Sequence, residues 1–545
     1  MIGKMTMEAL IVCDNIMHME KEKLGEKDGF EGKPTSVWLD TTPGTNYPSF
    51  IEPGKVDNSG PSSAKSYDTG RQARMTIDVC VVGGGIAGLM TAYLLTETGY
   101  NVAVVEAGRI VEDVTAHTTA KITSQHSDIY SYLIKNVGEA KAKMYADANQ
   151  AGLRKIVSII MEKKIDCDLV KQSAYIFTEK NRNVPMLKKE AESAQRLGLL
   201  ATFVENTPLG FDKGAVELKN QAQFHPRKFL LFLAKEISSS GYIFEKTRAL
   251  DIKNGSVLTD RGKITAKHIV IATHFPFYDK EHFYTKLFPH RSYVLGLELD
   301  GEVPEGMYFS IDGNRNTVRN FKFGGKRYLL VGGGTEKAGE DADTHKYYEQ
   351  IKQYADARFK LKSIDYHWFT QDNRTLDRVP YIGRLSGKDN IYVATGFGGW
   401  GMTTSAVSAM IITDLISGKV NLWAGIFDPN RKDHVRYAKT IIGENAKLAQ
   451  HLLSRRLRRH AFDLPTGFES GEGRIIKVRG KKVAVYKDKA GKIFAMSPKC
   501  AHMGCTVNWN GTEKTWDCPC HGSRYNYDGK VIHGPALRDL KKEEI

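Results

Sequence analysis

The segment that decides the fold is Thr76–Gly88, TIDVCVVGGGIAG, in which an apolar run meets a glycine-rich turn. Ile77–Val82 has the composition of a buried strand, and Ile86–Thr98 carries apolar residues at helical spacing. Asn101–Val105 has the pattern of the next strand. The segment therefore predicts a strand–helix–strand unit with parallel strands.

The glycines of this turn have the spacing of a dinucleotide-binding fingerprint, Gly83-x-Gly85-x-x-Gly88. The first glycine permits the tight turn, the second lets the backbone approach a pyrophosphate, and the third lets the helix pack on the strand. The helix N-terminus stabilises phosphate charge, and Glu106, which ends the second strand, can accept hydrogen bonds from ribose hydroxyls. The fingerprint predicts a nucleotide cofactor, but it does not separate FAD from NAD.

Two later segments favour FAD. Ile269–Thr273 is a strand that ends in the small residues Ala272 and Thr273, and Asn390–Met402 is a strand that runs into a glycine-rich helix start. The whole arrangement resembles the D-amino-acid oxidase and glycine oxidase family of FAD-dependent oxidoreductases, over roughly residues 75–430. The resemblance implies an FAD site that includes Ala272 and Thr273, with flavin-ring contacts from Gly396, Gly398, Gly399, Gly401 and Met402. The alternative for the last group is a tight strand-to-helix turn without a cofactor role.

A second glycine run, Gly332–Lys337, also follows a predicted strand. Its third glycine position is occupied by Lys337, and Glu336 would repel a phosphate. We therefore expect no second dinucleotide site, which disfavours a reductase driven by NAD(P)H.

The arginine that binds the substrate carboxylate in the resembled family is missing from its expected position. Amino-acid oxidases of that family hold the substrate carboxylate with an arginine three residues before the threonine of a Thr-x-Asp-x-x-Pro-x-Ile-Gly segment. Here that segment is Thr375–Gly383, and the earlier position is Asp372. Arg374 or Arg378 could substitute, although a structural or surface role fits an arginine equally well. Asp372 could instead favour a cationic amine.

Three further polar residues, His117, Lys121 and His126, follow the fingerprint unit. They could act in acid–base chemistry, or they could line the FAD cavity or cap a helix. The catalytic residues stay unknown, and the candidates are His117, Lys121, Arg374 and Arg378.

Four of the seven cysteines lie in one short window near the C-terminus. They form two boxes, Cys500-Ala-His502-Met-Gly-Cys505 and Cys518-Pro-Cys520-His521-Gly-Ser523, each with two cysteines and one histidine. Such spacing indicates a metal site or an iron–sulfur cluster rather than a secreted disulfide scaffold. Two cysteines and two histidines also suit structural zinc, but zinc does not explain the second cysteine pair.

The two boxes resemble the Rieske iron–sulfur domain over roughly residues 468–545. The resemblance implies that Cys500 and Cys518 ligate one iron of a 2Fe–2S cluster and that His502 and His521 ligate the other. It also implies a disulfide between Cys505 and Cys520, and hydrogen bonds from Ser523 and Tyr525 to sulfur, which would raise the reduction potential. Gly534-Pro535-Ala536 matches the loop that covers a Rieske cluster.

Length, composition and charge indicate the number of domains and the location of the protein. The 545 residues are 41% hydrophobic and 26% charged, so we expect a folded protein of several domains. The net charge of +15 is concentrated in residues 431–545, where 24 Lys and Arg face 12 Asp and Glu. No stretch approaches the ~18 apolar residues that span a bilayer. We therefore expect a cytoplasmic protein, with peripheral membrane contact left open.

The expected fold is an α/β Rossmann-like FAD-binding domain with an inserted antiparallel substrate-domain sheet, followed by a small all-β Rieske domain at the C-terminus. The expected divisions are an N-terminal arm with a flexible insertion (1–74), the oxidoreductase domain (75–430) with FAD-binding parts (about 75–150, 222–275 and 370–430) and a substrate layer (about 151–221 and 276–369), a basic helix and linker (431–467), and the Rieske domain (468–545).

This combination of domains predicts a dehydrogenase. A small molecule with a CH–NH or CH–OH group would give a hydride to FAD, and the cluster would pass single electrons to an external acceptor. The basic C-terminal end favours an acidic redox protein or a quinone-type acceptor, unless it is only a solvated basic surface.

Two other classes of function stay open. The chain could be a redox relay without its own small substrate, or a Rieske-fed reductase or oxygenase component, although the sequence lacks a convincing second iron site of two histidines and a carboxylate. Nucleic acid is disfavoured as a partner because the sequence contains no recognisable DNA- or RNA-binding motif.

Overall fold

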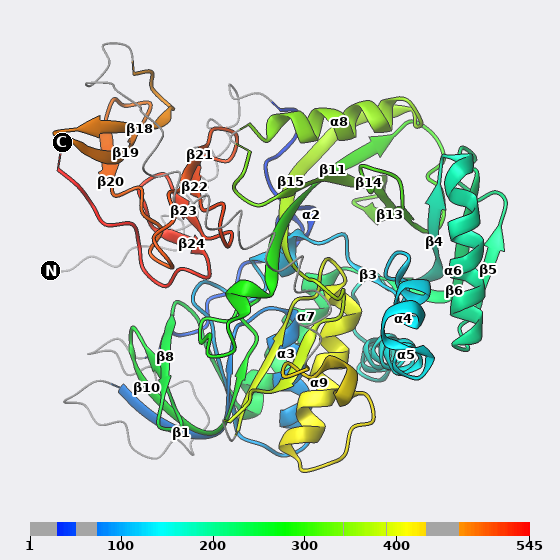
Figure 1. Ribbon diagram of the computed structural model, residues 1–545, viewed down its shortest axis with the longest axis horizontal. Coiled ribbons are helices and arrows are strands. Elements are labelled where there is room, and N and C mark those ends of the chain that lie inside the picture. Colours follow the sequence, from blue (N-terminus) through cyan, green and yellow to red (C-terminus); the bar gives the residue numbers. More distant parts are fainter. Residues whose placement is uncertain (1–29, 51–72, 342, 388–389, 432–467, 545) are drawn as a thin grey trace, which may run out of the picture.

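The computed structural model describes residues 30–50, 73–341, 343–387, 390–431 and 468–544 (Figure 1). Most of the predicted N-terminal arm and flexible insertion (1–74), and all of the predicted basic helix and linker (431–467) except Arg431, lie outside these residues. Within them, two large sheets and a small β domain make up the molecule (Figure 1).

The first sheet has eight strands and carries the nucleotide fingerprint. Its strands, in spatial order, are β16 (Tyr381–Arg384), β17 (Ile391–Thr395), β10 (Gly262–Ile271), β1 (Ala73–Val82), β2 (Val102–Val105) and β7 (Tyr242–Phe244), with β9 (Ser256–Thr259) and β8 (Ala249–Lys253) joined to β10. The strands from β17 to β7 pair in parallel, whereas β16, β9 and β8 pair antiparallel.

Both faces of this sheet are buried, which explains the continuous apolar run of its strands. Val79 and Val81 of β1 belong to one core and Cys80 and Val82 to another, because successive side chains point to opposite faces. The first core also contains residues of the helices α3 (Ile86–Glu97), α7 (Pro226–Ser240) and α9 (Gly401–Ile416).

The second sheet has nine strands. In spatial order they are β15 (Leu361–Thr375), β11 (Leu287–Leu299), β14 (Lys326–Lys337), β13 (Thr317–Phe323), β12 (Met307–Ser310), β4 (Val170–Thr178), β6 (Gly214–Gln223) and β3 (Lys121–Ile122), with β5 (Ala201–Val204) joined to β6. Every pair is antiparallel except β4 with β12, so the inserted antiparallel sheet is confirmed with one parallel contact.

The glycine run Gly332–Lys337 is part of β14 and not a loop after a strand. Gly332 and Gly333 pair with β11, and Gly332 also pairs with β13. Strand pairing on both sides of β14 explains why this run does not form a phosphate-binding turn.

The remaining helices connect and cover the two sheets (Figure 1). They are α2 (Val37–Asp40), α4 (Ile129–Val137), α5 (Glu139–Glu162), α6 (Val184–Arg196), α8 (His345–Asp356) and α10 (Ala424–Phe427), with short 3-10 turns at Val114–His117, Asn181–Asn183 and Phe283–Thr285. Of the N-terminal arm, residues 30–50 pack on the molecule: Trp38 is buried and its Nε1 donates to Thr118 O at 2.7 Å.

The C-terminal domain contains only β strands among its described elements. A three-stranded antiparallel sheet is formed by β18 (Gly473–Val478), β19 (Lys481–Lys487) and β20 (Ile493–Met496), and a four-stranded one by β21 (Asn508–Asn510), β22 (Thr515–Asp517), β23 (Arg524–Asn526) and β24 (Val531–His533). This confirms the predicted small all-β domain.

Candidate functional site

The turn between β1 and α3 leaves no room for side chains. Gly83 has a φ of +114°, and a Cβ on it would lie 2.4 Å from Ala272 O. A Cβ on Gly88 would lie 1.8 Å from Gly83 O. Gly83 and Gly88 are therefore required by the close approach of β1, β10 and α3.

Glu106 holds the shape of the same turn. Its carboxylate accepts hydrogen bonds from the main-chain N–H groups of Gly84, at 2.7 Å, and Gly108, at 2.8 Å. Burial raises the pKa of Glu106, and these two hydrogen bonds partly oppose the effect. The side chain also borders the cavity described next, where its remaining lone pairs can accept from a ribose.

A cavity of about 850 Å³ lies at the fingerprint turn. This volume falls within the range of cofactor and ligand sites. Among the residues predicted to bind the cofactor, Gly88 packs behind the turn and the others line the cavity: Gly83, Gly85, Glu106, Ala272, Thr273, Gly396, Gly398, Gly399, Gly401 and Met402. The structure thus brings together three segments that are far apart in sequence.

The C-terminal domain also lines this cavity, through residues 531–537. His533 Nδ1 donates to Asp113 Oδ2 at 2.8 Å, and this contact joins the two domains. Asp113 lines the cavity, and although desolvation there opposes ionisation, His533 and His274 hold the pKa of its carboxyl well below the ordinary value. The sequence did not reveal this contact, because 420 positions separate the two residues.

Charged side chains from the second sheet face another part of the cavity. Arg378 pairs with Asp128 at 2.7 Å, so its charge is already compensated. Arg374 and Arg315 form no ion pair within the described part of the chain, and burial lowers the pKa of both. Asp372 also lines the cavity, and burial raises its pKa to about 6 although Arg374 opposes the shift.

Of these residues, sequence reasoning missed Arg315. It lies 59 positions before Arg374, between β12 and β13, and no motif marks it. The two arginines meet at the cavity although β11 and β14 separate β15 from β13 in the sheet.

The three polar residues after the fingerprint have other partners. Lys121 Nζ donates to Tyr308 O at 2.6 Å and also contacts Thr317 Oγ1, and burial lowers its pKa well below the ordinary value. His126 uses both ring nitrogens, with Tyr145 Oη and Thr123 O, and stacks on Trp400. His117 Nδ1 contacts Asp113 O at 2.8 Å. All three line the cavity, and their structural hydrogen bonds weigh against a free catalytic base.

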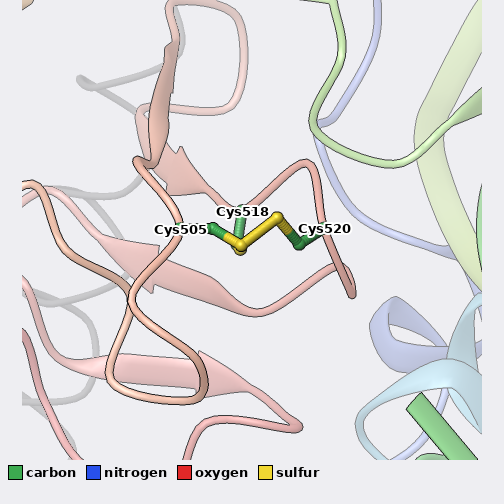
Figure 2. Close-up of side chains that lie close together, drawn as sticks. All are labelled: Cys505, Cys518 and Cys520. Carbon is green, nitrogen blue, oxygen red and sulfur yellow. A yellow bond between two sulfur atoms is a disulfide. The ribbon is translucent and has the colours of Figure 1, made fainter. Parts of the chain in front are cut away.

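In the C-terminal domain, a disulfide between Cys505 and Cys520 joins the two cysteine–histidine boxes (Figure 2). Cys518 lies close to both disulfide sulfurs, so that three sulfurs gather within 4.8 Å. Because the disulfide consumes two of these thiols, only the Cys518 thiol remains to bind a metal from this group.

The two free cysteines of the boxes, Cys500 and Cys518, are both buried. Cys500 Sγ lies 3.1 Å from Tyr525 Oη, and Tyr525 also accepts from the N–H of Ala501 at 2.9 Å. Ser523 Oγ accepts from the N–H of Ala536 at 3.0 Å, which ties the ligand loop to the cavity-lining segment. Tyr525 thus occupies the place in which a hydrogen bond to a cysteine sulfur was expected.

The two histidines of the boxes face the oxidoreductase domain. The rings of His502 and His521 are 4.9 Å apart, and Phe275 lies 6.1 Å from one and 6.2 Å from the other. Tyr284 lies 6.0 Å from His521. Within the described residues, Nδ1 of His502 and both ring nitrogens of His521 are buried without a hydrogen-bond partner.

Unpartnered buried imidazole nitrogens are costly in a protein interior. Beside two buried thiols, they form the donor set that a Rieske cluster requires. The residues therefore fit a 2Fe–2S cluster, just as the side-chain-free turn at Gly83 and Gly88 fits a dinucleotide.

Comparison with known proteins agrees with this geometry. Residues 78–415 match the family model described as "FAD dependent oxidoreductase", and residues 461–543 match the "Rieske [2Fe-2S] domain". The chain belongs to the FAD dependent oxidoreductase family. Its cofactors are accordingly FAD and, in the C-terminal Rieske domain, a 2Fe–2S cluster.

Relatives cover different parts of this FAD dependent oxidoreductase. YhfW of Bacillus subtilis (strain 168), named as a Rieske 2Fe-2S iron-sulfur protein, is 39% identical over 86% of this chain and 93% of its own length. Gamma-glutamylputrescine oxidoreductase of Escherichia coli (strain K12) is 25% identical over 65% of this chain and 86% of its own.

Among solved structures, glycine oxidase from Geobacillus kaustophilus covers 66% of this chain and 99% of its own, with a TM-score of 0.56 and 17% identity. That likeness concerns the fold of the oxidoreductase domain. Across the described residues, no helix combines the length and the apolarity required to cross a lipid bilayer.

Proposed function

We propose that this oxidoreductase removes a hydride from the carbon next to nitrogen in a small amine or amino acid, and that electrons pass through the Rieske domain to an external acceptor. When bound, FAD supplies hydride acceptance and the 2Fe–2S cluster supplies one-electron transfer. The residues of the chain bind and orient these groups and the substrate.

The observation that carries this proposal is the shared position of the two sites. Residues 531–537 of the Rieske domain line the same cavity as the dinucleotide fingerprint. His502 and His521 face Phe275, which itself lines that cavity. A docked domain with its histidine edge toward the cavity favours electron transfer inside one chain over transfer between separate molecules.

The proposal assigns residues to each cofactor. Cys500 and Cys518 hold one iron of the cluster, His502 and His521 hold the other, and Tyr525 donates to the Cys500 sulfur. The glycines of the fingerprint and Glu106 hold the nucleotide half of FAD, and the glycine loop at 396–402 lies along the flavin. These assignments rest on buried donors without partners and on the cavity lining.

The substrate class follows from the charges in the cavity. Arg315 and Arg374 line the cavity and form no ion pair among the described residues, which favours an anionic group such as a carboxylate. Asp372 also lines the cavity, near Arg374, and offers a carboxylate that suits an ammonium. The relative gamma-glutamylputrescine oxidoreductase is named for a substrate that contains both kinds of group, and this supports a CH–NH donor over a CH–OH donor.

Anaerobic titration of the full-length protein tests the proposal. Amino acids, amines with and without a carboxylate, and hydroxy acids are added in turn while the flavin absorbance and the EPR signal of the cluster are followed. We expect carboxylate-bearing amines to bleach the flavin first, and a Rieske signal to follow.

Two results would count against the proposal. A cluster that stays oxidised beside fully reduced flavin would exclude transfer within the chain. Reduction by a ferredoxin-like protein but by no small amine would favour the redox relay.

For the acceptor, we propose an acidic redox protein. Residues 431–545 carry 24 basic and 12 acidic residues, and such a charge excess accelerates encounters with an acidic partner. Added salt should then slow reduction of an acidic acceptor but not of a neutral quinone. Equal salt dependence for both acceptors would contradict this.

A further inference from the structure

The loop that carries Cys518 and His521 is held from outside its own domain. Gln371 of β15, in the oxidoreductase domain, donates through Nε2 to Gly522 O at 3.0 Å. Gly522 directly follows His521, has a φ of +73°, and has no room for a Cβ because Gln371 Nε2 would lie 2.5 Å from it.

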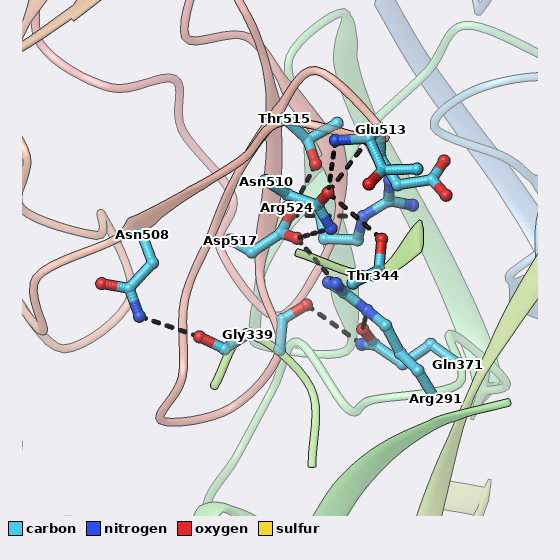
Figure 3. Close-up of polar contacts among 12 residues, drawn as sticks. Arg291, Gly339, Thr344, Gln371, Asn508, Asn510, Glu513, Thr515, Asp517 and Arg524 are labelled. Carbon is cyan, nitrogen blue, oxygen red and sulfur yellow. Dashed lines mark hydrogen bonds and ion pairs between the residues drawn. The ribbon is translucent and has the colours of Figure 1, made fainter. Parts of the chain in front are cut away.

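The same glutamine reaches the other end of the loop through an arginine. Its Oε1 accepts from Arg291 Nε at 3.3 Å, and Arg291 Nη1 donates to Asp517 Oδ2 at 2.7 Å. Asp517 directly precedes Cys518. Figure 3 shows this arrangement, with Gln371 and Arg291 on one side of the contact and Asp517 on the other.

We propose that Gln371 is a positioning residue for the iron–sulfur cluster. It bonds Gly522 at one end of the loop formed by residues 517–522, and through Arg291 it is linked to Asp517 at the other end. The proposal rests on the assignment of Cys518 and His521 as ligands. The electronic properties of the cluster then depend on the docked oxidoreductase domain, since second-shell hydrogen bonds orient ligands and tune the metal centre.

The position of Gln371 gives this clamp a further consequence. Side chains alternate along a strand, so Gln371 faces the Rieske loop while Asp372, the next residue, lines the cofactor cavity. One strand therefore borders both redox sites, and the loop that carries two ligands is fixed relative to the cavity.

Asn508 Nδ2 donates to Gly339 O at 2.9 Å across the same domain contact (Figure 3), but Gly339 packs against Cys518, so this bond is no independent control. A second buried glutamine supplies one. Gln223 Nε2 donates to Asn320 O at 2.8 Å within the second sheet. Gln371→Leu and Gln223→Leu each remove a buried amide that bonds a main-chain carbonyl.

The test uses full-length holoprotein reduced chemically with dithionite. We measure iron content, the g-values of the cluster by EPR, and its midpoint potential. We expect Gln371→Leu to shift the g-values and the potential, and Gln223→Leu to leave both as in the wild type. Wild-type values in Gln371→Leu, or an equal shift in Gln223→Leu, would overturn the proposal.

A second variant covers the case in which Gln371→Leu loses iron. Gln371→Glu retains the oxygen that accepts from Arg291 and replaces the N–H donor to Gly522 O by a carboxylate oxygen, which repels that carbonyl. Shifted g-values in this variant support the proposal, and unchanged ones refute it. Because no substrate is involved, failure of the ligand assignment is recognised separately, by the absence of a Rieske signal from the wild type.

Discussion

At the fingerprint turn, a single methyl group decides whether the strand and the helix can meet. We predict that Gly88→Ala loses most of its FAD, because the new Cβ would lie 1.8 Å from Gly83 O and force α3 away from β1. Such overpacking typically costs about 1–3 kcal/mol. Flavin absorbance of the purified protein and its urea midpoint measure the two effects.

Gly108→Ala is the matched control for this substitution. Its Cβ would meet Glu106 Oε1 at 3.7 Å, which is ordinary contact, and its N–H remains available to Glu106. If both variants retained flavin equally, the steric account of Gly88 would be wrong.

The carboxyl group of Asp372 leads to a second prediction, on how the rate of flavin reduction depends on pH. Burial raises its pKa to about 6, so the group is charged above pH 6 and neutral below. If it holds the substrate ammonium, kcat/KM for flavin reduction by a cationic amine falls about tenfold per pH unit below pH 6. Anaerobic stopped-flow measurements from pH 5 to 8 record this fall in kcat/KM, and the Asp372→Asn variant should not show it. Identical profiles for both proteins would remove Asp372 from substrate binding.

Protonation of the same group also enters the stability of the fold. Because its pKa is higher in the folded protein than the ordinary 3.8, the folded state binds this proton more tightly. The contribution of Asp372 to stability therefore decreases as the pH rises from about 4 through 6. In urea unfolding, Asp372→Asn should flatten this part of the pH dependence.

Among the elements, the two ligand boxes depend on the bond that joins them. Cys505 and Cys520 close a loop with a sequence separation of 15. A loop of this length corresponds to about 3 kcal/mol of stabilisation. We predict that Cys505→Ser with Cys520→Ser loses about that amount and releases iron at lower urea concentration, measured by fluorescence and by the EPR signal.

Cys167→Ala controls for the loss of a buried sulfur. It is a free cysteine outside the Rieske domain and should leave iron release unchanged. An iron-release midpoint in the double serine variant equal to that of the wild type would show that the ligand loops hold together without the disulfide.

The element scale also separates what the sequence could predict from what it could not. The turn at Gly83–Gly88 and the two boxes are local, because each is specified by residues a few positions apart. The turn predicted a nucleotide cofactor, the later segments at 269–273 and 390–402 favoured FAD, and the resemblance of the boxes implied the 2Fe–2S cluster. The sequence did not show that the glycine run at 332–337 continues its strand, because pairing with β11 and β13 overrides local glycine preference. Arg315 was missed because it lies in the connection between β12 and β13, whereas Arg374 lies on β15.

On the scale of the whole molecule, the docking of the Rieske domain was beyond sequence reasoning. Asp113 contacts His533, and Arg291 contacts Asp517, only when both domains are folded and docked. This docking places the unpartnered imidazole nitrogens of His502 and His521 toward Phe275 and Tyr284. The two motifs that the sequence reveals separately therefore lie close together in the folded molecule, where both domains line one cavity.

The ion pair between Arg291 and Asp517 yields the last prediction. Both side chains are 1% exposed, and Arg291 holds the pKa of Asp517 below its ordinary value against the effect of burial. Removing one partner of a buried pair costs about 3–5 kcal/mol, because the other charge is left without compensation. We therefore expect Arg291→Met and Asp517→Asn each to lower the free energy of unfolding by that amount.

A double-mutant cycle isolates the pair from its surroundings. Asp517 also lies 3.5 Å from Arg524, but Arg524 is present in all four proteins, so its contribution largely cancels. The double variant should lose clearly less stability than the sum of the single variants, because neither charge is then left unpaired. Urea unfolding followed by tryptophan fluorescence measures all four free energies. Strict additivity would mean that the contact between Arg291 and Asp517 does not fasten the Rieske domain to the oxidoreductase domain.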